Sequence, residues 1–355
     1  MKNFLFVLFI TLGIQLHGQT NAQYVNVFIG TDGTGHTFPG PSMPFGMVQP
    51  GLDNREQGWD YTSGYQFSDS LLLGFSQTRF SGTGISEMGD ILLLPFDDQH
   101  DKSLKNRYFK DSEKASVGYY SLVKKDGVKV ELTCSERVAF HRYSFPTRDA
   151  NVLASFQHGL RFLTDSLVLD SEIKLEGNQS ISGYCHTKNW VDRKYYFVLK
   201  FDQPFTRSIE LPKIRKENAP KYQLNFHLDD SKVLQAKIAM STVSVEGAKL
   251  NLQTEIPGWD FDQIRQKAEK VWDNYLNRID IEADAKQKEI FYTSLYHFFL
   301  QPSNIADVDG KYRGADDKIG LSLHKEYYST LSIWDIYRGA FPLLEIIAPE
   351  RINGI

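Results

Sequence analysis

The sequence has no excess of basic residues and no long basic run. Its 40 lysines and arginines are scattered among 44 aspartates and glutamates, which gives a formal net charge of -4. Nucleic-acid-binding domains carry clustered positive charge, so this composition excludes a nucleic-acid partner. Internal repeats and low-complexity segments are absent too, whereas 41% of the residues are hydrophobic. In a chain of 355 residues, this is enough for the cores of about two globular domains.

Long apolar runs are missing apart from one at residues 4–16, which follows Lys2. A helix needs about 20 apolar residues to cross the hydrocarbon of a membrane, so this run is short for an anchor. A basic start, a short apolar run and small or polar residues up to Ala22 are typical of a signal peptide. We expect cleavage of residues 1–22 and export to the periplasm or the extracellular space, with no membrane attachment afterwards. An uncleaved anchor is the alternative, and the lack of a cysteine after the run disfavours a lipoprotein.

Cysteine is scarce, since Cys134 and Cys185 are the only two. A disulfide between them is conceivable in an exported chain, but the sequence does not require it. Cys134 shares the apolar face of the alternating run at residues 128–134, which favours a buried free thiol.

What the sequence does contain, from about residue 23 to 256, is a series of short alternating runs separated by Gly, Asp, Asn and Pro. Clear examples lie at residues 128–134, 195–201 and 237–245. Many short strands at this spacing, without intervening helices, indicate a mainly antiparallel β-sandwich. We expect this domain to span residues 23–256.

Helical periodicity begins at Asp260, which forms a capping-box pattern with Gln263 and predicts a linker helix within residues 257–284. Further helices are expected at residues 285–300 and from about residue 331 to 344. Their wide aromatic stripes need partners, which in an α-helical domain would be further helices. We therefore expect residues 285–355 to be the truncated start of an α-helical domain, and the chain to be a fragment or a truncated gene product.

Two segments near the amino terminus could bind a ligand. In the first, glycines that include Gly35 allow close approach of the main chain, and His36 adds a polar group. A tight structural loop is the alternative, and no Lys-Ser or Lys-Thr follows as a phosphate loop would require. In the second, Trp59 stands among glycines and tyrosines, as in a platform for the C–H face of a sugar. A core tryptophan is the alternative there.

Acidic residues elsewhere have more ordinary interpretations. Glu87 and Asp90 follow a segment rich in Ser, Thr and Gly, and we expect them to be structural hydrogen-bond acceptors rather than catalysts. Residues 307–310 read Asp-Val-Asp-Gly and suggest a calcium loop, but Lys318 stands where the EF-hand pattern requires glutamate. We expect an exposed loop at that point.

The predicted third helix contains Trp334, Asp335 and Arg338. Asp335 and Arg338 are three positions apart and would be neighbours on one helix face. The pair is either a surface ion pair or, with the adjacent indole, a clamp for a sugar.

Taken in order, these segments resemble glycoside hydrolase family 92 over essentially the whole mature chain. The resemblance implies a β-sandwich followed by a linker helix and the start of an (α/α)6 barrel, with the active site between them. It further implies a calcium-dependent, inverting exo-α-mannosidase acting on mannose-containing glycans such as N-glycans or mannan. The alternative is a carbohydrate-binding sandwich without catalysis. The motifs that carry the resemblance lie at residues 28–30, 35–40, 44–47, 58–61, 75–84, 243–246, 251–252, 255–261 and 332–338.

The resemblance places Gly35, His36, Trp59 and Asp335 around the terminal mannose, with Arg338 orienting Asp335. It also implies that the catalytic acid and base, and most of the calcium ligands, belong to later barrel helices, so no catalytic residue and no metal ligand is expected within this chain. Gln77 and Arg79 depart from the family pattern, in which histidine is more frequent, so the sugar contacts of that segment are open.

Overall fold

The computed structural model describes residues 20–98, 102–161, 167–212, 218–329 and 333–355. Most of the predicted signal peptide therefore lies outside the described residues. Within them, no helix combines the length and the apolar character that a membrane span requires.

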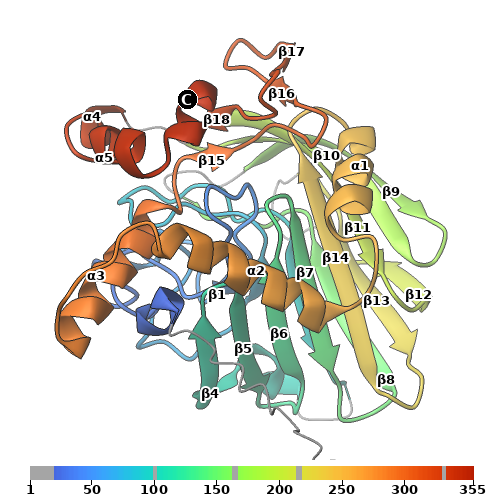
Figure 1. Cartoon of the computed structure of the whole chain (residues 1–355). Coiled ribbons are helices and arrows are strands. Elements are labelled where there is room, and N and C mark those ends of the chain that lie inside the picture. The colour runs from blue at the N-terminus through green and yellow to red at the C-terminus, as the bar shows by residue number, and fades with distance from the viewer. Residues whose placement is uncertain (1–19, 99–101, 162–166, 213–217, 330–332) are drawn as a thin grey trace, which may run out of the picture.

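Two antiparallel sheets form the body of the molecule (Figure 1). The six-stranded sheet has the order β1 (Gly51–Asp53), β2 (Gly74–Ser76), β3 (Leu92–Phe96), β8 (Asp149–Ser155), β13 (Lys221–His227) and β12 (Phe205–Glu210). The eight-stranded sheet has the order β4 (Tyr108–Ser116), β5 (Tyr119–Lys124), β6 (Lys129–Cys134), β7 (Val138–Ser144), β14 (Val233–Ser241), β11 (Asp192–Phe201), β10 (Ser180–Lys188) and β9 (Val168–Glu176).

The main hydrophobic core lies between these two sheets. It joins buried residues such as Leu93 and Leu224 of the six-stranded sheet to Val130 and Ile238 of the other. The rings of Phe201 and Phe226, one from each sheet, lie 5.1 Å apart. Apolar side chains that alternate along each strand thus fill one shared layer, as the sequence pattern predicted. The prediction of a mainly antiparallel β-sandwich is confirmed.

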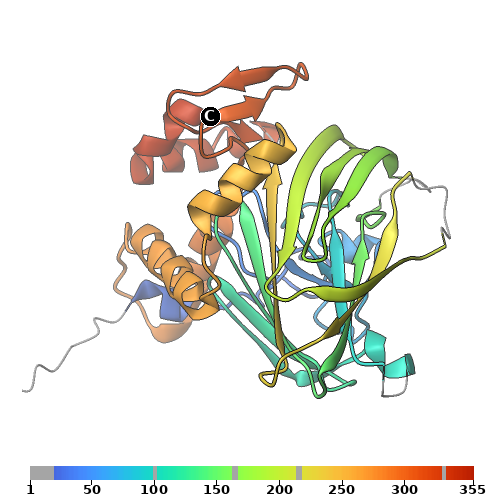
Figure 2. The ribbon, with the colours of Figure 1, turned by 90° about the vertical axis from the view of Figure 1, so that its right-hand side faces the viewer.

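Helices cover the outer face of the eight-stranded sheet. They are α1 (Val245–Glu255), α2 (Phe261–Leu276) and α3 (Ala285–Phe298), which Figure 2 shows on one side of the strands. Phe140 of β7 packs against Phe261 with ring centroids 5.2 Å apart. Most residues of β7 and β14 are therefore buried, including those on the face that points toward the helices.

The helix α1 corrects the prediction that a strand continues to residue 245. The strand β14 ends at Ser241, and the Ser244 hydroxyl accepts a hydrogen bond from the Gly247 N–H at 3.0 Å. This N-cap starts a helix where Val243 and Val245 prolong the alternating pattern of β14. The alternation of Val243 and Val245 therefore led to the prediction of a strand at the point where the helix α1 begins.

The predicted linker helix and second helix are both present, as α2 and α3. Asp260 caps α2 by accepting from the Gln263 N–H, while Asp284 and Gln287 form a complete capping box at α3. The predicted third helix is divided into α4 (Ile333–Ile336) and α5 (Ala340–Ile347), and its first residues lie outside the described part. Gly339 stands between the two pieces, where glycine disfavours continued helix.

The aromatic stripes of α2 and α3 find partners within this chain, contrary to the expectation that only further helices would cover them. Trp272 lies 4.5 Å from Tyr296 between ring centroids, and its indole N–H donates to the Ser42 carbonyl at 2.7 Å. Phe45 contacts Phe299 in the same second core. Residues 22–48 thus form a shared layer between the sandwich and the helices.

Short elements complete the chain. The two-stranded pairs are β15 (Ser303–Asn304) with β18 (Tyr328–Ser329), and β16 (Lys311–Arg313) with β17 (Ile319–Leu321). The short 3-10 helices are η1 (Asn21–Tyr24), η2 (Trp59–Tyr61), η3 (Lys102–Asn106) and η4 (Pro349–Gly354). The segment from β15 to the C terminus lies across one end of the sandwich in both views (Figures 1 and 2).

Both cysteines are free and buried, Cys134 in β6 and Cys185 in β10. The interpretation of Cys134 as a buried thiol is confirmed. Burial raises the pKa of Cys134 well above its ordinary range and that of Cys185 to about 12, so both remain neutral thiols.

Candidate functional site

Trp59 and His36 meet at the surface of the sandwich. Their rings stand edge to face with centroids 4.9 Å apart, and Trp59 is 60% exposed whereas His36 is only 6% exposed. The loop of Gly84 supports the indole, since a Cβ added to Gly84 would lie 2.8 Å from its Cη2 atom. An exposed indole that is fixed along its edges can present a ring face to a ligand.

The glycine loop before His36 is tightly closed. A Cβ on Gly35 would lie 2.1 Å from the Gly30 carbonyl oxygen, and His36 itself has a φ of 57°. The His36 carbonyl accepts from the Gly82 N–H at 2.8 Å. Segments 30–37, 58–61 and 82–84 therefore converge, and they hold together three predicted site residues, Gly35, His36 and Trp59.

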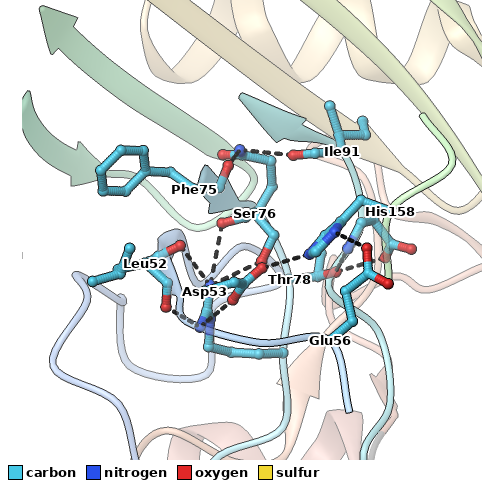
Figure 3. Close-up of polar contacts among 12 residues, drawn as sticks. Leu52, Asp53, Glu56, Phe75, Ser76, Thr78, Ile91 and His158 are labelled. Carbon is cyan, nitrogen blue, oxygen red and sulfur yellow. Dashed lines mark hydrogen bonds and ion pairs between the residues drawn. The ribbon is translucent and has the colours of Figure 1, made fainter. Parts of the chain in front are cut away.

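A buried ionic network lies at the base of the loop of residues 53–65 that carries Trp59. His158 stands between two carboxylates, with Nε2 2.7 Å from Asp53 Oδ2 and Nδ1 3.2 Å from Glu56 Oε1 (Figure 3). Burial lowers the pKa of His158, but hydrogen bonds and charge from Asp53 and Glu56 outweigh this and raise it to about 9. The imidazole is therefore protonated at neutral pH.

Arg79 completes this network from the other side. Its Nη1 atom is 3.1 Å from Asp53 Oδ1, and both side chains are fully buried. Its guanidinium also donates to the carbonyls of Gly51 and Ser63, each at 2.8 Å, one at either end of the loop. A Cβ on Gly64 would lie 2.2 Å from Asp53 Oδ1, so the loop closes directly over the ion pair. The network thus holds both ends of the Trp59 loop.

Gln77 and Arg79, which depart from the family pattern, both form hydrogen bonds inside the protein. Gln77 donates to the carbonyls of Phe75 and Ile91, at 2.8 Å and 3.0 Å, and its other amide atom bonds to His141. Both side chains are buried.

A cavity of about 860 Å³ opens between the sandwich and the segment of residues 303–329. Its wall includes Thr78, Glu87, Arg193, Tyr195, Arg313 and Tyr327. Arg193 Nη2 lies 2.7 Å from Asp90 Oδ1, and Glu87 Oε2 accepts from the Trp190 N–H at 2.9 Å. Glu87 and Asp90 are thus hydrogen-bond acceptors, as predicted.

Asp335 and Arg338 lie on a different element from the other predicted site residues. Asp335 belongs to α4 and is exposed, while Arg338 follows the end of that helix and is exposed too. Asp335 and Arg338 therefore do not share one helix face as predicted, because α4 ends at Ile336. Trp334 beside them is 85% exposed.

Residues 307–310 are not the exposed loop that we predicted, whereas Asp316 and Asp317 farther along the same segment are exposed. Asp307 is buried, and its two oxygens accept from Ser241 Oγ and Asn251 Nδ2, both at 2.7 Å. It thereby ties β14 and α1 to the segment after β15. Among the described residues, no three or more His, Cys, Asp or Glu side chains lie close enough together to hold a metal ion.

Sequence reasoning missed Asp53, Glu56 and His158. Asp53 ends β1 and Glu56 follows it closely, whereas His158 is about a hundred positions away, so no local pattern links the three. The burial of Arg79, whose charge needs an acidic partner, points to them only once the fold is known.

Comparison with known proteins gives two family matches along the chain. Residues 24–241 match the glycosyl hydrolase family 92 N-terminal domain, and residues 247–355 match the glycosyl hydrolase family 92 catalytic domain. A protein from Arthroderma benhamiae, named as an uncharacterized secreted glycosidase, is 26% identical over 79% of this chain and 42% of its own length.

Solved structures agree with these matches. A family 92 α-mannosidase from Bacteroides thetaiotaomicron superposes with a TM-score of 0.84 at 31% identity, over 94% of this chain and 48% of its own. The same enzyme in complex with mannoimidazole gives a TM-score of 0.85 at 31% identity, over 94% and 47%. The chain thus spans less than half the length of these relatives.

Proposed function

The chain belongs to glycoside hydrolase family 92, and from this premise we propose that it forms the sugar-binding, amino-terminal part of an exported exo-α-mannosidase acting on mannose-containing glycans. The single observation that carries the proposal is Trp59, an exposed indole held rigidly by His36 and the Gly84 loop. A related α-mannosidase in complex with mannoimidazole supports mannose as the sugar. A signal-peptide pattern at residues 1–22 and the name of the secreted fungal relative support export.

In this proposal, the residues of the chain bind and orient the sugar. The indole of Trp59 packs against the C–H face of the pyranose, and the edge contact with His36 fixes the angle of the ring. The Gly35 loop brings main-chain groups close to the sugar without a side chain in between. Asp335 of α4 and Arg338, which follows this helix, would supply polar contacts.

We further propose that the catalytic acid and base come from outside these 355 residues. An inverting glycosidase needs two carboxyl groups about 6.5–9.5 Å apart, one to protonate the leaving oxygen and one to activate water. Three buried carboxylates near the site are engaged within the protein: Glu87 by backbone N–H groups, Asp90 by Arg193, and Asp53 by His158 and Arg79. Calcium, which the family relationship implies, would likewise take its ligands mostly from elsewhere.

The 355-residue chain should therefore release no mannose from α-1,2-mannobiose in the presence of calcium. Free mannose would be measured by a coupled enzymatic assay, with an active α-mannosidase as the positive control. Turnover that disappears in Glu87→Gln or Asp90→Asn would contradict the proposal, because it would place the acid or base within this chain.

A further inference from the structure

A second cavity, of about 460 Å³, opens on the outer face of the eight-stranded sheet. The helix α1 lies over β10, β11 and β14 there, and the cavity is bordered by this helix and the three strands (Figure 1). Its size is within the range of about 300–1,000 Å³ that small-molecule sites occupy. In the described part of the chain, it shares no wall residue with the cavity beside residues 303–329.

Positive charge predominates on the wall of this second cavity. Among the described residues that border it, Lys200, Lys237 and Lys249 are basic and Glu176 is acidic. Glu176 Oε1 lies 3.1 Å from Lys249 Nζ, so these two charges balance each other. Neither Lys200 nor Lys237 forms an ion pair with any described residue. Two cations without acidic partners thus border one concave surface, where the low-dielectric wall strengthens their field.

Lys237 is held in a fixed position. Its Nζ atom donates to the carbonyls of Ile256 and Gly258, both at 3.0 Å, and lies 3.8 Å from the ring centroid of Trp259. An ammonium group has three N–H donors, so one donor remains after these two hydrogen bonds. A fixed ammonium group with a spare donor can bind an anion at a small cost in side-chain entropy.

The two unpaired lysines also repel each other. Burial lowers the pKa of Lys237 to about 8, and the positive charge of Lys200 contributes to this shift, whereas Asp202 opposes it. An anion bound near both ammonium groups would offset the repulsion between them. The cavity therefore favours an anionic ligand over a neutral one.

The rest of the wall suits a small molecule that has both apolar and hydroxyl groups. Val198, Leu252 and Ile256 border the cavity and belong to the apolar cluster that joins the sheet to α1. Gln179 and Gln253 border it too, and a side-chain amide can donate to a hydroxyl group or accept from one. A monosaccharide with an acidic group combines C–H groups, hydroxyl groups and negative charge.

We propose that this cavity binds an acidic monosaccharide, a uronate or a sugar phosphate, whose anionic group lies near Lys200 and Lys237. The amides of Gln179 and Gln253 bond to hydroxyl groups of the sugar, and its C–H groups contact the apolar part of the wall. None of these contacts involves Trp59, so the binding is independent of the proposed mannose site.

The test follows the indole N–H signals of the 15N-labelled 355-residue chain during titration with glucuronate, glucose 6-phosphate or methyl α-glucoside at constant ionic strength. Trp259 borders the cavity, so its signal should shift with saturation on addition of an acidic sugar and stay in place with the neutral glucoside. Comparison of glucuronate with glucose 6-phosphate distinguishes a carboxylate ligand from a phosphate ligand.

Lys200→Gln should weaken the binding of the acidic sugar about tenfold, because it removes one of the two unpaired charges. Lys200 is exposed, so the thermal unfolding midpoint should not fall. Lys114→Gln is the matched control, since Lys114 is an exposed lysine on β4, at the opposite edge of the sheet from β9, and its loss should leave the affinity unchanged.

If neither acidic sugar shifts the Trp259 signal with saturation, the inference is overturned and the Trp59 site is untouched. Equal affinities of the wild type and Lys200→Gln, or an equal response to methyl α-glucoside, would contradict recognition of charge. Saturation by inorganic phosphate at the same dissociation constant would also overturn the inference, because it would show that the cavity holds an ion rather than a sugar.

Discussion

Replacing Asp53 by alanine should lower the free energy of unfolding by about 3–5 kcal/mol, because it leaves two buried cations without their shared partner. Arg79 and His158 both bind this carboxylate, and neither can reach solvent readily. The measurement is urea unfolding followed by circular dichroism. Asp230→Ala is the matched control, since Asp230 forms an ion pair with Arg148 at the surface and should shift the midpoint little.

A midpoint for Asp53→Ala that equals that of the wild type would show that the network does not stabilise the fold. Asp53→Asn separates charge from shape, because the amide can occupy the same space without neutralising Arg79. We expect it to be destabilised as well, by less than the alanine variant.

The same network predicts a dependence of stability on pH. The pKa of His158 is raised from 6.5 to about 9 in the folded protein, so folding favours the protonated form. Its contribution is complete below about pH 6.5 and is lost as the pH rises through about 9. The difference in unfolding free energy between the wild type and His158→Gln should therefore be constant in acid and shrink above neutrality. A difference that does not change between pH 6 and pH 10, measured at about one-unit steps, would contradict a charged His158.

Trp59→Ala should weaken the binding of methyl α-mannoside by about 30-fold or more, which corresponds to the loss of a principal contact of about 2 kcal/mol. Stability should change little, since the indole is 60% exposed. Trp59→Phe keeps an aromatic face and should retain part of the affinity. Dissociation constants from ligand-observed NMR would measure the loss, and Trp259→Phe serves as a control for a tryptophan packed against Phe140.

Unchanged mannoside affinity in Trp59→Ala would show that Trp59 is not a sugar platform. A large fall in the unfolding midpoint of this variant would instead assign Trp59 to the core, which was the alternative interpretation of its sequence context.

A carbohydrate-binding sandwich without catalysis fits the fold less well than part of a larger enzyme does. Residues 22–48 pack between the sandwich and the helices, where Trp272 donates to the Ser42 carbonyl and Phe45 contacts Phe299. Removal of α2 and α3 would expose these aromatic groups. The sandwich and the helices thus share a core rather than forming separable modules.

The fold was largely predictable because its signals are local. Alternation gave the strands of the sandwich, the cap at Asp260 gave α2, and the spacing of apolar residues gave α3. The N-cap at Ser244 was missed, because Val243 and Val245 continue the alternation of β14. Burial of the helix stripes was misjudged because their partners, including Phe45, precede them by more than two hundred residues.

The site was predictable only in part, because some of its contacts join residues that are far apart in the sequence. Gly35, His36 and Trp59 lie in short segments whose composition is unusual on its own, and the structure brings them together. Asp53 and His158 are linked only by a side-chain contact between segments about a hundred positions apart. Long-range polar pairs need the fold before they can be identified.

The central claim is that Trp59 faces the mannose, and the indole N–H signals of the chain test it most directly. The five tryptophans give five signals in a 15N-labelled protein, which single Trp→Phe variants assign. On addition of methyl α-mannoside, the signal of Trp59 should shift, while those of Trp259 and the buried Trp272 stay in place. A Trp59 signal that does not move at saturating sugar would contradict the account.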